Sequence, residues 1–170
     1  YIISKEIYEK FECIVFHMTD LPYGRGGSPL QNLIRKGHST TKITAIKVKE
    51  GIDSGDIYLK KDLELNGTAK EIFLRANLVI EKMISLMLTN NLIPKPQCGW
   101  VSNFKRLKPE DGIINDLNDL NLVYDYIRML DCEGYPPAFM ETDKLKIEFF
   151  NAQYDKTSET IMANVRVFKK

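Results

Sequence analysis

One long amphipathic helix is the sequence feature that most constrains the fold. Thr68 follows Asn66–Gly67, and Glu71 stands three residues later, which is the pattern of a capping box at a helix start. Apolar residues then recur at three- and four-residue spacing, at Ile72, Ala76, Val79, Ile80, Met83 and Met87. The pattern predicts a helix over residues 69–89 whose apolar stripe belongs to the protein core rather than to a cofactor site.

Three segments before this helix are predicted to be strands. Residues 12–17 form a short, mostly apolar run, as in a strand that is covered on both faces. Residues 42–49 alternate apolar and polar side chains, with an imperfect fit at Ala45–Ile46, and residues 57–65 make the third strand. We therefore expect a parallel α/β sheet in this part of the chain.

Two shorter helices are predicted beside these strands. Residues 4–11 place apolar side chains on one face, and Ser4 can cap this helix. A second helix begins at Ser28, with Pro29 at its first position and Gln31 completing another capping box.

The second half of the chain has a different organisation. Residues 91–115 contain prolines and show no periodicity, whereas residues 119–131 read as a helix and residues 144–154 and 159–168 as antiparallel strands joined by a turn. We divide the chain into an α/β part (1–91), a linker (92–111) and a small β-rich module (112–170).

Composition excludes several broad classes. The net charge is +1 and 44% of the residues are apolar, so there is no overall attraction to nucleic acid or to anionic membranes. Charges interrupt the longest helix, which argues against a membrane span. The three cysteines, Cys13, Cys98 and Cys132, are far apart, which fits reduced thiols and a cytoplasmic location. No Cys/His cluster has metal-ligand spacing, so we expect no metal.

Two polar residues stand where strands end. His17 closes the strand at residues 12–17, and Asp53 lies in the turn Gly51–Asp56 that follows the strand at residues 42–49. Ligands and chemistry in open α/β sheets concentrate at such strand ends.

The segments around His17 and Asp53 resemble the 10-formyltetrahydrofolate-dependent formyltransferases. The loop LPYGRGG, followed by Ser-Pro, is similar to the Pro-x-[Tyr/Trp]-Arg-Gly loop and proline-initiated helix of that family, and GIDSGD is similar to its second signature. Downstream, NFKRLKPEDGII resembles the family linker and YDYIRMLDCEGYPPAF the start of its C-terminal module. The resemblance implies the C-terminal half of a Rossmann-like formyltransferase domain, followed by a small C-terminal module.

The resemblance also implies roles for individual residues. His17 would shuttle protons, and Asp53 would orient the imidazole and stabilise its cationic form. Substrate-binding residues are expected at Thr19, Arg25, Gly26, Gly27 and Asp56, and contacts to the co-substrate 10-formyltetrahydrofolate at Ile2, Ile3, Lys49, Glu50, Gly51 and Ile52. The loop GRGGS before a helix could also cradle an anion, although close turns explain its glycines equally well. His38 is expected in an exposed loop, and Trp100 is expected to pack the linker onto the core.

The chain departs from the family pattern at two places. Val15 stands where the family has an asparagine that donates to the formyl oxygen, and Thr19 is the nearest hydroxyl that could replace it. The sequence begins at Tyr1, within an apolar run, where family members have already completed a βαβ half; we expect that half to be missing or supplied by another chain, such as a second copy.

The acceptor is less constrained than the chemistry. Residues 112–170 contain seven Lys/Arg and ten Asp/Glu, which disfavours tRNA because phosphate neutralisation dominates such binding. We expect an amino-sugar nucleotide or a similar small amine. The alternatives are a methionyl-tRNA formyltransferase-like enzyme, a variant that passes the formyl group to water, and a non-catalytic remnant or subunit.

Overall fold

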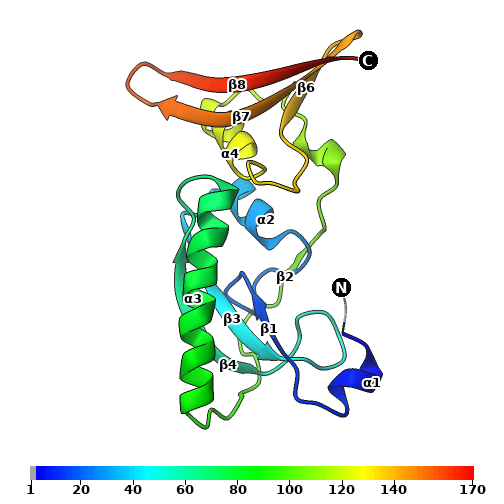
Figure 1. The fold of residues 1–170 in the computed structure, drawn as a ribbon, viewed down its shortest axis with the longest axis vertical. Coiled ribbons are helices and arrows are strands. Elements are labelled where there is room, and N and C mark those ends of the chain that lie inside the picture. Colours follow the sequence, from blue (N-terminus) through cyan, green and yellow to red (C-terminus); the bar gives the residue numbers. More distant parts are fainter. Residues whose placement is uncertain (1–2) are drawn as a thin grey trace.

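A computed structural model describes residues 3–170 of the chain (Figure 1). Ile2, expected to contact the co-substrate, lies outside the described residues. The elements are, in chain order, α1 (Lys5–Tyr8), β1 (Ile14–His17), β2 (Arg25–Gly26), α2 (Pro29–Arg35), β3 (Thr40–Lys47), β4 (Ile57–Glu64), α3 (Ala69–Thr89), β5 (Asn103–Phe104), a 3-10 turn (Pro109–Gly112), α4 (Leu120–Arg128), β6 (Phe139–Glu141), β7 (Leu145–Asp155) and β8 (Thr160–Lys169).

The predicted strands β1, β3 and β4 form one sheet, but they do not pair as expected. Their order is β1-β3-β4 and both pairings are antiparallel, with His17 opposite Thr44. The expectation of a parallel sheet is therefore wrong for the described strands. Because β1 and β3 run in opposite directions, their last residues lie at opposite ends of the pair, and Asp53 reaches His17 only because the loop after β3 folds back.

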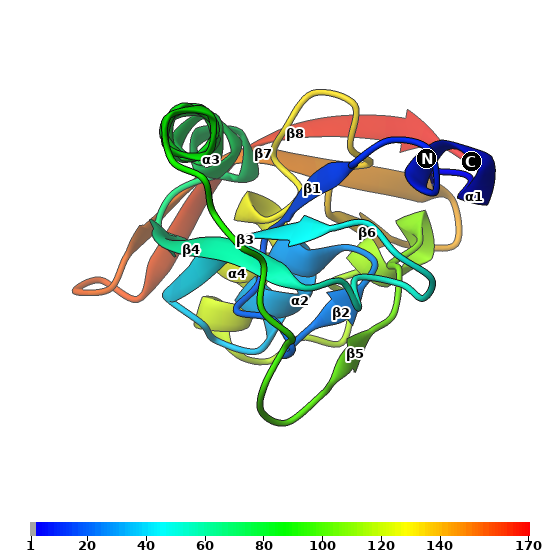
Figure 2. The same ribbon diagram turned by 90° about the horizontal axis from the view of Figure 1, so that it is seen from below.

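The helix α3 has the predicted bounds and the predicted cap. The Glu71 amide donates to the Thr68 hydroxyl over 3.3 Å, and the Thr68 amide donates to the Glu71 carboxylate over 2.8 Å. The apolar stripe is buried at Ile72, Ala76 and Met83, where α3 lies along β3 and β4 (Figures 1 and 2). This helix and sheet form the core that positions the site.

The capping box predicted at Ser28 is wrong. Ser28 has a left-handed backbone (φ 49°), and its hydroxyl accepts the Leu107 amide over 3.0 Å instead of capping α2. Gln31 donates to the Met129 carbonyl over 3.3 Å rather than to its own helix start. Contacts to distant segments thus replace the local cap. Ser4 likewise makes no side-chain cap bond to α1.

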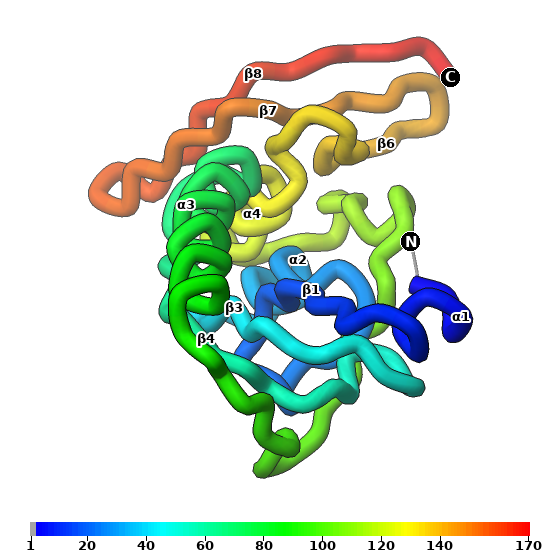
Figure 3. Tube along the Cα trace, turned by 60° about the horizontal axis from the view of Figure 1, so that its bottom comes forward, coloured from blue at the N-terminus to red at the C-terminus, as the bar shows by residue number. Residues whose placement is uncertain are grey.

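The C-terminal part folds as predicted into a helix and a hairpin. Strands β6, β7 and β8 form an antiparallel sheet, and α4 packs on β7. The long hairpin lies across the end of the molecule where α3 begins (Figure 3). Arg128 joins the two parts, since its Nη1 donates to the carbonyls of Leu65 (2.6 Å) and Gly67 (2.9 Å). Among the residues described, no helix is both long and apolar enough to cross a membrane.

Candidate active site

His17 and Asp53 meet in the structure. The His17 ring is 8% exposed at the end of β1, and its Nδ1 lies 3.4 Å from Oδ2 of Asp53. Its Nε2 lies 2.8 Å from the Gly24 carbonyl oxygen. Both ring nitrogens therefore face oxygen acceptors, which suits the imidazolium form because both of its nitrogens carry a proton.

The loop that carries Asp53 is held by the loop LPYGRGG (residues 21–27), the first motif loop. Oδ2 of Asp53 accepts the Gly26 amide over 2.8 Å, so the carboxylate bridges the first motif loop and His17. Asp53 itself adopts the left-handed region (φ 46°), which is uncommon for a residue other than glycine. The surroundings must therefore fix this conformation.

Gln97 is part of this arrangement, although no sequence pattern predicted it. Its side chain accepts from Arg25 and donates to carbonyls of the Asp53 loop, at Asp53 and Gly55. Gln97 stands in the proline-rich tract before β5, where no periodicity or motif spacing marks it. The linker (residues 92–111), which forms the connector between the two parts, runs beside the first motif loop, with β5 parallel to β2 (Figure 2).

A small apolar cavity opens beside Asp53. Its volume is about 140 Å³, and its lining includes Ile3, Val15, Lys49, Ile52 and Asp53. The structure thus brings three of the expected co-substrate residues, Ile3, Lys49 and Ile52, next to the expected catalytic aspartate. Glu50 and Gly51 are exposed and do not line this cavity.

Two of the expected substrate-binding residues are engaged within the protein. Thr19 is fully buried and its hydroxyl donates to the Gly24 carbonyl over 3.4 Å, so it offers no donor to a molecule in the cavity. The expectation that Thr19 replaces the missing asparagine does not fit this geometry. The Asp56 carboxylate pairs with the Lys49 ammonium over 3.0 Å.

The glycines of the first loop have a packing reason. A Cβ at Gly26 would lie 2.4 Å from the Phe104 carbonyl oxygen, and a Cβ at Gly27 would lie 2.5 Å from Cβ of Arg106. The connector thus passes too close for any other residue. Since α2 has only seven residues and Ser28 makes no cap bond, these glycines are explained by packing rather than by an anion cradle.

A basic groove lies next to these glycines. It has a volume of about 770 Å³ between α2 and the connector. Its basic side chains are Arg35, Lys36, Lys105, Arg106 and Lys108, none of which forms an ion pair within residues 3–170. The acidic residue in the lining is Asp111.

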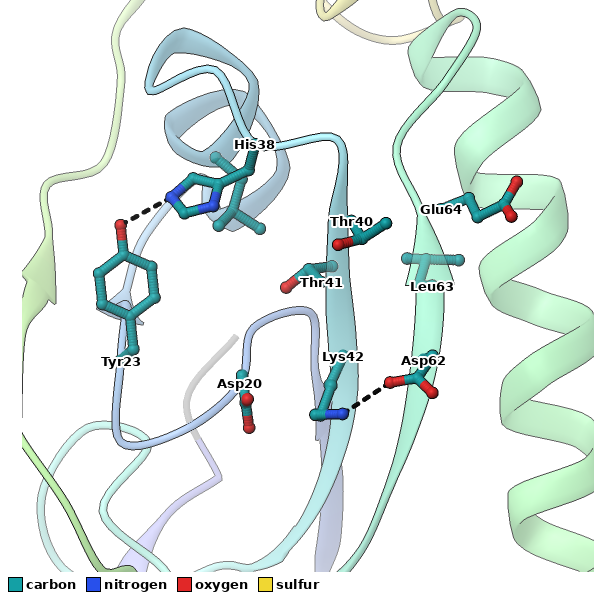
Figure 4. Close-up of a pocket in the computed structure, with 10 residues that line it drawn as sticks. Asp20, Tyr23, His38, Thr40, Thr41, Lys42, Asp62, Leu63 and Glu64 are labelled. Atoms are coloured by element: carbon teal, nitrogen blue, oxygen red, sulfur yellow. Dashed lines mark hydrogen bonds and ion pairs between the residues drawn. The ribbon is translucent and has the colours of Figure 1, made fainter.

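Another cavity, of about 730 Å³, lies between Asp20 and Tyr23 of the loop after β1 and residues of β3 and β4 (Figure 4). His38 lies in a loop, as expected, but it is half-buried rather than exposed and bonds the Tyr23 hydroxyl over 3.1 Å. Trp100 stacks on Tyr23 with ring centroids 6.4 Å apart, yet it is 76% exposed and packs only weakly onto the core. Lys42 and Asp62 form an ion pair over 2.6 Å in the wall of this cavity.

No group of three or more potential ligands for a metal ion occurs in residues 3–170. The site around His17 offers an imidazole, a carboxylate and backbone groups beside an apolar cavity.

Comparison with known proteins identifies the family. The family model of the methionyl-tRNA formyltransferase C-terminal domain matches residues 109–168. A solved methionyl-tRNA formyltransferase from Clostridium thermocellum is 52% identical, with a TM-score of 0.96, over 100% of this chain and 74% of that chain. The chain belongs to the formyltransferase family.

Other formyltransferases are more distant. The methionyl-tRNA formyltransferase of Thermodesulfovibrio yellowstonii is 32% identical over 155 residues, which is 86% of this chain and 50% of that protein. The chain spans about half the length of the curated relatives it matches. The N-formyltransferase from Helicobacter canadensis, solved with folinic acid and dTDP-3-aminofucose, is 17% identical with a TM-score of 0.62, over 92% of this chain and 65% of that one, a likeness in fold alone.

Proposed function

We propose that this formyltransferase chain carries the catalytic pair of an enzyme that moves the formyl group of 10-formyltetrahydrofolate to a primary amine. The observation that carries the proposal is the buried His17 ring, 3.4 Å from the carboxylate of Asp53, and Asp53 in turn lines an apolar cavity. A histidine with a carboxylate partner is suited to proton transfer near neutral pH.

Formyl transfer requires proton transfers at two nitrogens and a catalytic group held in a fixed orientation. The attacking amine forms a C–N bond to the formyl carbon and loses a proton, while the bond from that carbon to the folate nitrogen breaks and the nitrogen gains one. Asp53 would hold the ring by Nδ1 and stabilise its cationic form. His17 would accept and return a proton through Nε2, which must part from the Gly24 carbonyl oxygen to do so.

The cavity beside Asp53 is the proposed place of the co-substrate's ring. Ile3, Ile52 and Val15 would provide apolar walls, and Lys49 would lie at its rim. Glu50 and Gly51 stay candidates through their backbone in the same loop. Val15 offers no side-chain donor to the formyl oxygen, so we expect a slower reaction than with an asparagine there.

Methionyl-tRNA is the acceptor that we now favour. The relatives cited at 30% identity or more are named methionyl-tRNA formyltransferases, whereas the cited N-formyltransferase structures, one of them solved with dTDP-3-aminofucose, are below 25% identity. Arg106, which lines the basic groove, packs against Gly27, the residue after the glycine whose amide bonds Asp53, so a phosphate held by Arg106 would lie on the side of the groove that faces the site. This support replaces the expectation of a sugar nucleotide, which rested on the acidic C-terminal residues.

The proposed organisation keeps the division at residues 91 and 112. The first part would carry the catalytic pair, and the connector would carry Gln97 and part of the basic groove. The last part would form a module whose helix α4 packs on α2.

The test is formyl transfer by the purified full chain. It is incubated with 10-formyltetrahydrofolate and, separately, with methionyl-tRNA and with a dTDP-amino sugar, and the formylated product is identified by mass. Formylation of methionyl-tRNA in preference to the sugar nucleotide is expected. Formylation of the sugar nucleotide alone would return the acceptor to that class, and no product with either would reject both assignments.

A further inference from the structure

The amide of Gln97 connects the two motif loops at the site. Its Oε1 accepts from Nε and Nη2 of Arg25, over 3.1 and 2.7 Å. Its Nε2 donates to the carbonyl oxygens of Asp53 and Gly55, each over 2.8 Å. Four hydrogen bonds therefore use both donors of the amide and both acceptor positions of its oxygen.

The chemistry of the partners explains why an amide stands here. The Arg25 guanidinium has donors and no acceptor, while the two backbone carbonyls only accept. A group between them must accept on one side and donate on the other. A carboxylate would lack the donors and a thioether would lack both strong functions, although either side chain has a similar length.

The segment that carries Gln97 is itself anchored. Lys95 and Ile57 exchange both backbone hydrogen bonds, over 2.7 and 2.9 Å, which ties the connector to the start of β4. Gly55 is pressed against β3, since a Cβ there would lie 1.7 Å from the Lys47 carbonyl oxygen. One Gln97 donor thus meets a fixed carbonyl, and the other holds the carbonyl of Asp53.

Asp53 needs such support because its backbone is in the left-handed region, at φ 46°. Conformations of this kind persist at functional sites only where the surroundings determine them. The carboxylate contacts to Gly26 and His17 depend on this backbone orientation. We propose that Gln97 is a positioning residue, which acts on the reaction by holding Asp53 against His17; this rests on the proposed function.

The experiment compares Gln97→Met and Gln97→Glu in the full chain, with the exposed Gln153→Met on β7 as the matched control. Displacing a catalytic group by about 1 Å costs on the order of 100-fold. We expect both Gln97 variants to remain folded by circular dichroism and to lower kcat by about that factor, a larger change than the change in the KM for the formyl donor. Gln153→Met should match the wild type.

A double-mutant cycle separates positioning from a general packing role. If Gln97 acts through Asp53, Gln97→Met should add little in an Asp53→Asn background, because the two losses share one cause. Full multiplication of the two effects, or an unchanged kcat in Gln97→Met, would overturn the inference.

A second readout needs no activity. The Gly26 amide is protected by its bond to Asp53, so its hydrogen exchange should accelerate in Gln97→Met and not in Gln153→Met. Absence of formyl transfer by the wild type would count against the proposed function alone. Unchanged Gly26 exchange would count against the role of Gln97.

Discussion

Among single residues, His17 has the surroundings on which the proposed chemistry depends. Its Nδ1 faces Asp53 and its Nε2 faces the Gly24 carbonyl, so a neutral ring, with one N–H, leaves one of these contacts without a proton. The proposed proton transfer at His17 would therefore also change these contacts.

Replacement of Asp53 by asparagine tests that pairing. The amide removes the charge that stabilises the imidazolium but keeps the side-chain volume, so folding should be retained. We expect kcat to fall by roughly 10²–10⁴-fold, the range for loss of general acid–base function. Steady-state formyl transfer measures it, with Asp62→Asn as control, since Asp62 pairs with Lys42 and contacts neither His17 nor the cavity beside Asp53. Equal losses in the two variants would contradict the assignment.

Val15 tests whether a missing donor limits the rate. It lines the cavity with Asp53, so an amide there would face the proposed formyl position. We expect Val15→Asn to raise kcat, by up to about 10²–10³-fold if it restores one full donor. Val15→Ala, which adds space without a donor, is the control. An unchanged or lower rate in Val15→Asn would show that the donor is not what this site lacks.

Among the helices and strands, α3 has a cap whose effect can be isolated. We expect Thr68→Ala to lower the free energy of unfolding by about 1 kcal/mol, the usual value of an N-cap hydroxyl. Urea denaturation measures it. Ser4→Ala provides the comparison, because Ser4 makes no cap bond, and it should change stability by less than about 0.5 kcal/mol.

The same cap predicts a pH dependence. The hydrogen bond from the Thr68 amide holds the pKa of Glu71 below its usual 4.5. A carboxyl whose pKa is lower in the folded state stabilises the fold above the unfolded value, and that contribution is lost as the pH falls through the folded value. The stability difference between wild type and Glu71→Gln should therefore shrink below pH 4.5. A constant difference through this range would exclude the carboxylate cap.

Elements set by local signals were predictable, and those set by distant contacts were not. The bounds of α3 and the C-terminal hairpin follow from capping and periodicity that act within a few residues. The Ser28 cap failed because Leu107, far along the chain, takes its hydroxyl. The strand direction and the contacts of Gln97 depend likewise on loops and a connector whose path no local pattern records.

Over the whole molecule, charge is divided between the two parts. Residues 1–111 contain 17 Lys/Arg against 13 Asp/Glu, whereas residues 112–170 have an acidic excess. The basic groove lies within residues 1–111, and its lining includes the end of the connector. If it binds tRNA phosphates, affinity should fall steeply with salt.

Removing part of that groove should weaken tRNA binding selectively. We expect Gln in place of Lys105, Arg106 and Lys108 together to raise the KM for methionyl-tRNA and to reduce the salt slope by about 0.7–0.9 for each lost phosphate contact. The control replaces Lys144, Lys156 and Lys169 of the C-terminal part. Equal effects from the two triple variants would indicate a general charge effect and no groove.

The decisive measurement for the His17–Asp53 pair is a single-turnover assay that follows tetrahydrofolate release together with the formylated amine in wild type and His17→Ala. We expect the wild-type full chain to form both products in equal amounts, and His17→Ala, folded by circular dichroism, to slow both by roughly 10²–10⁴-fold. Transfer at the wild-type rate in His17→Ala would contradict the assignment of the catalytic pair.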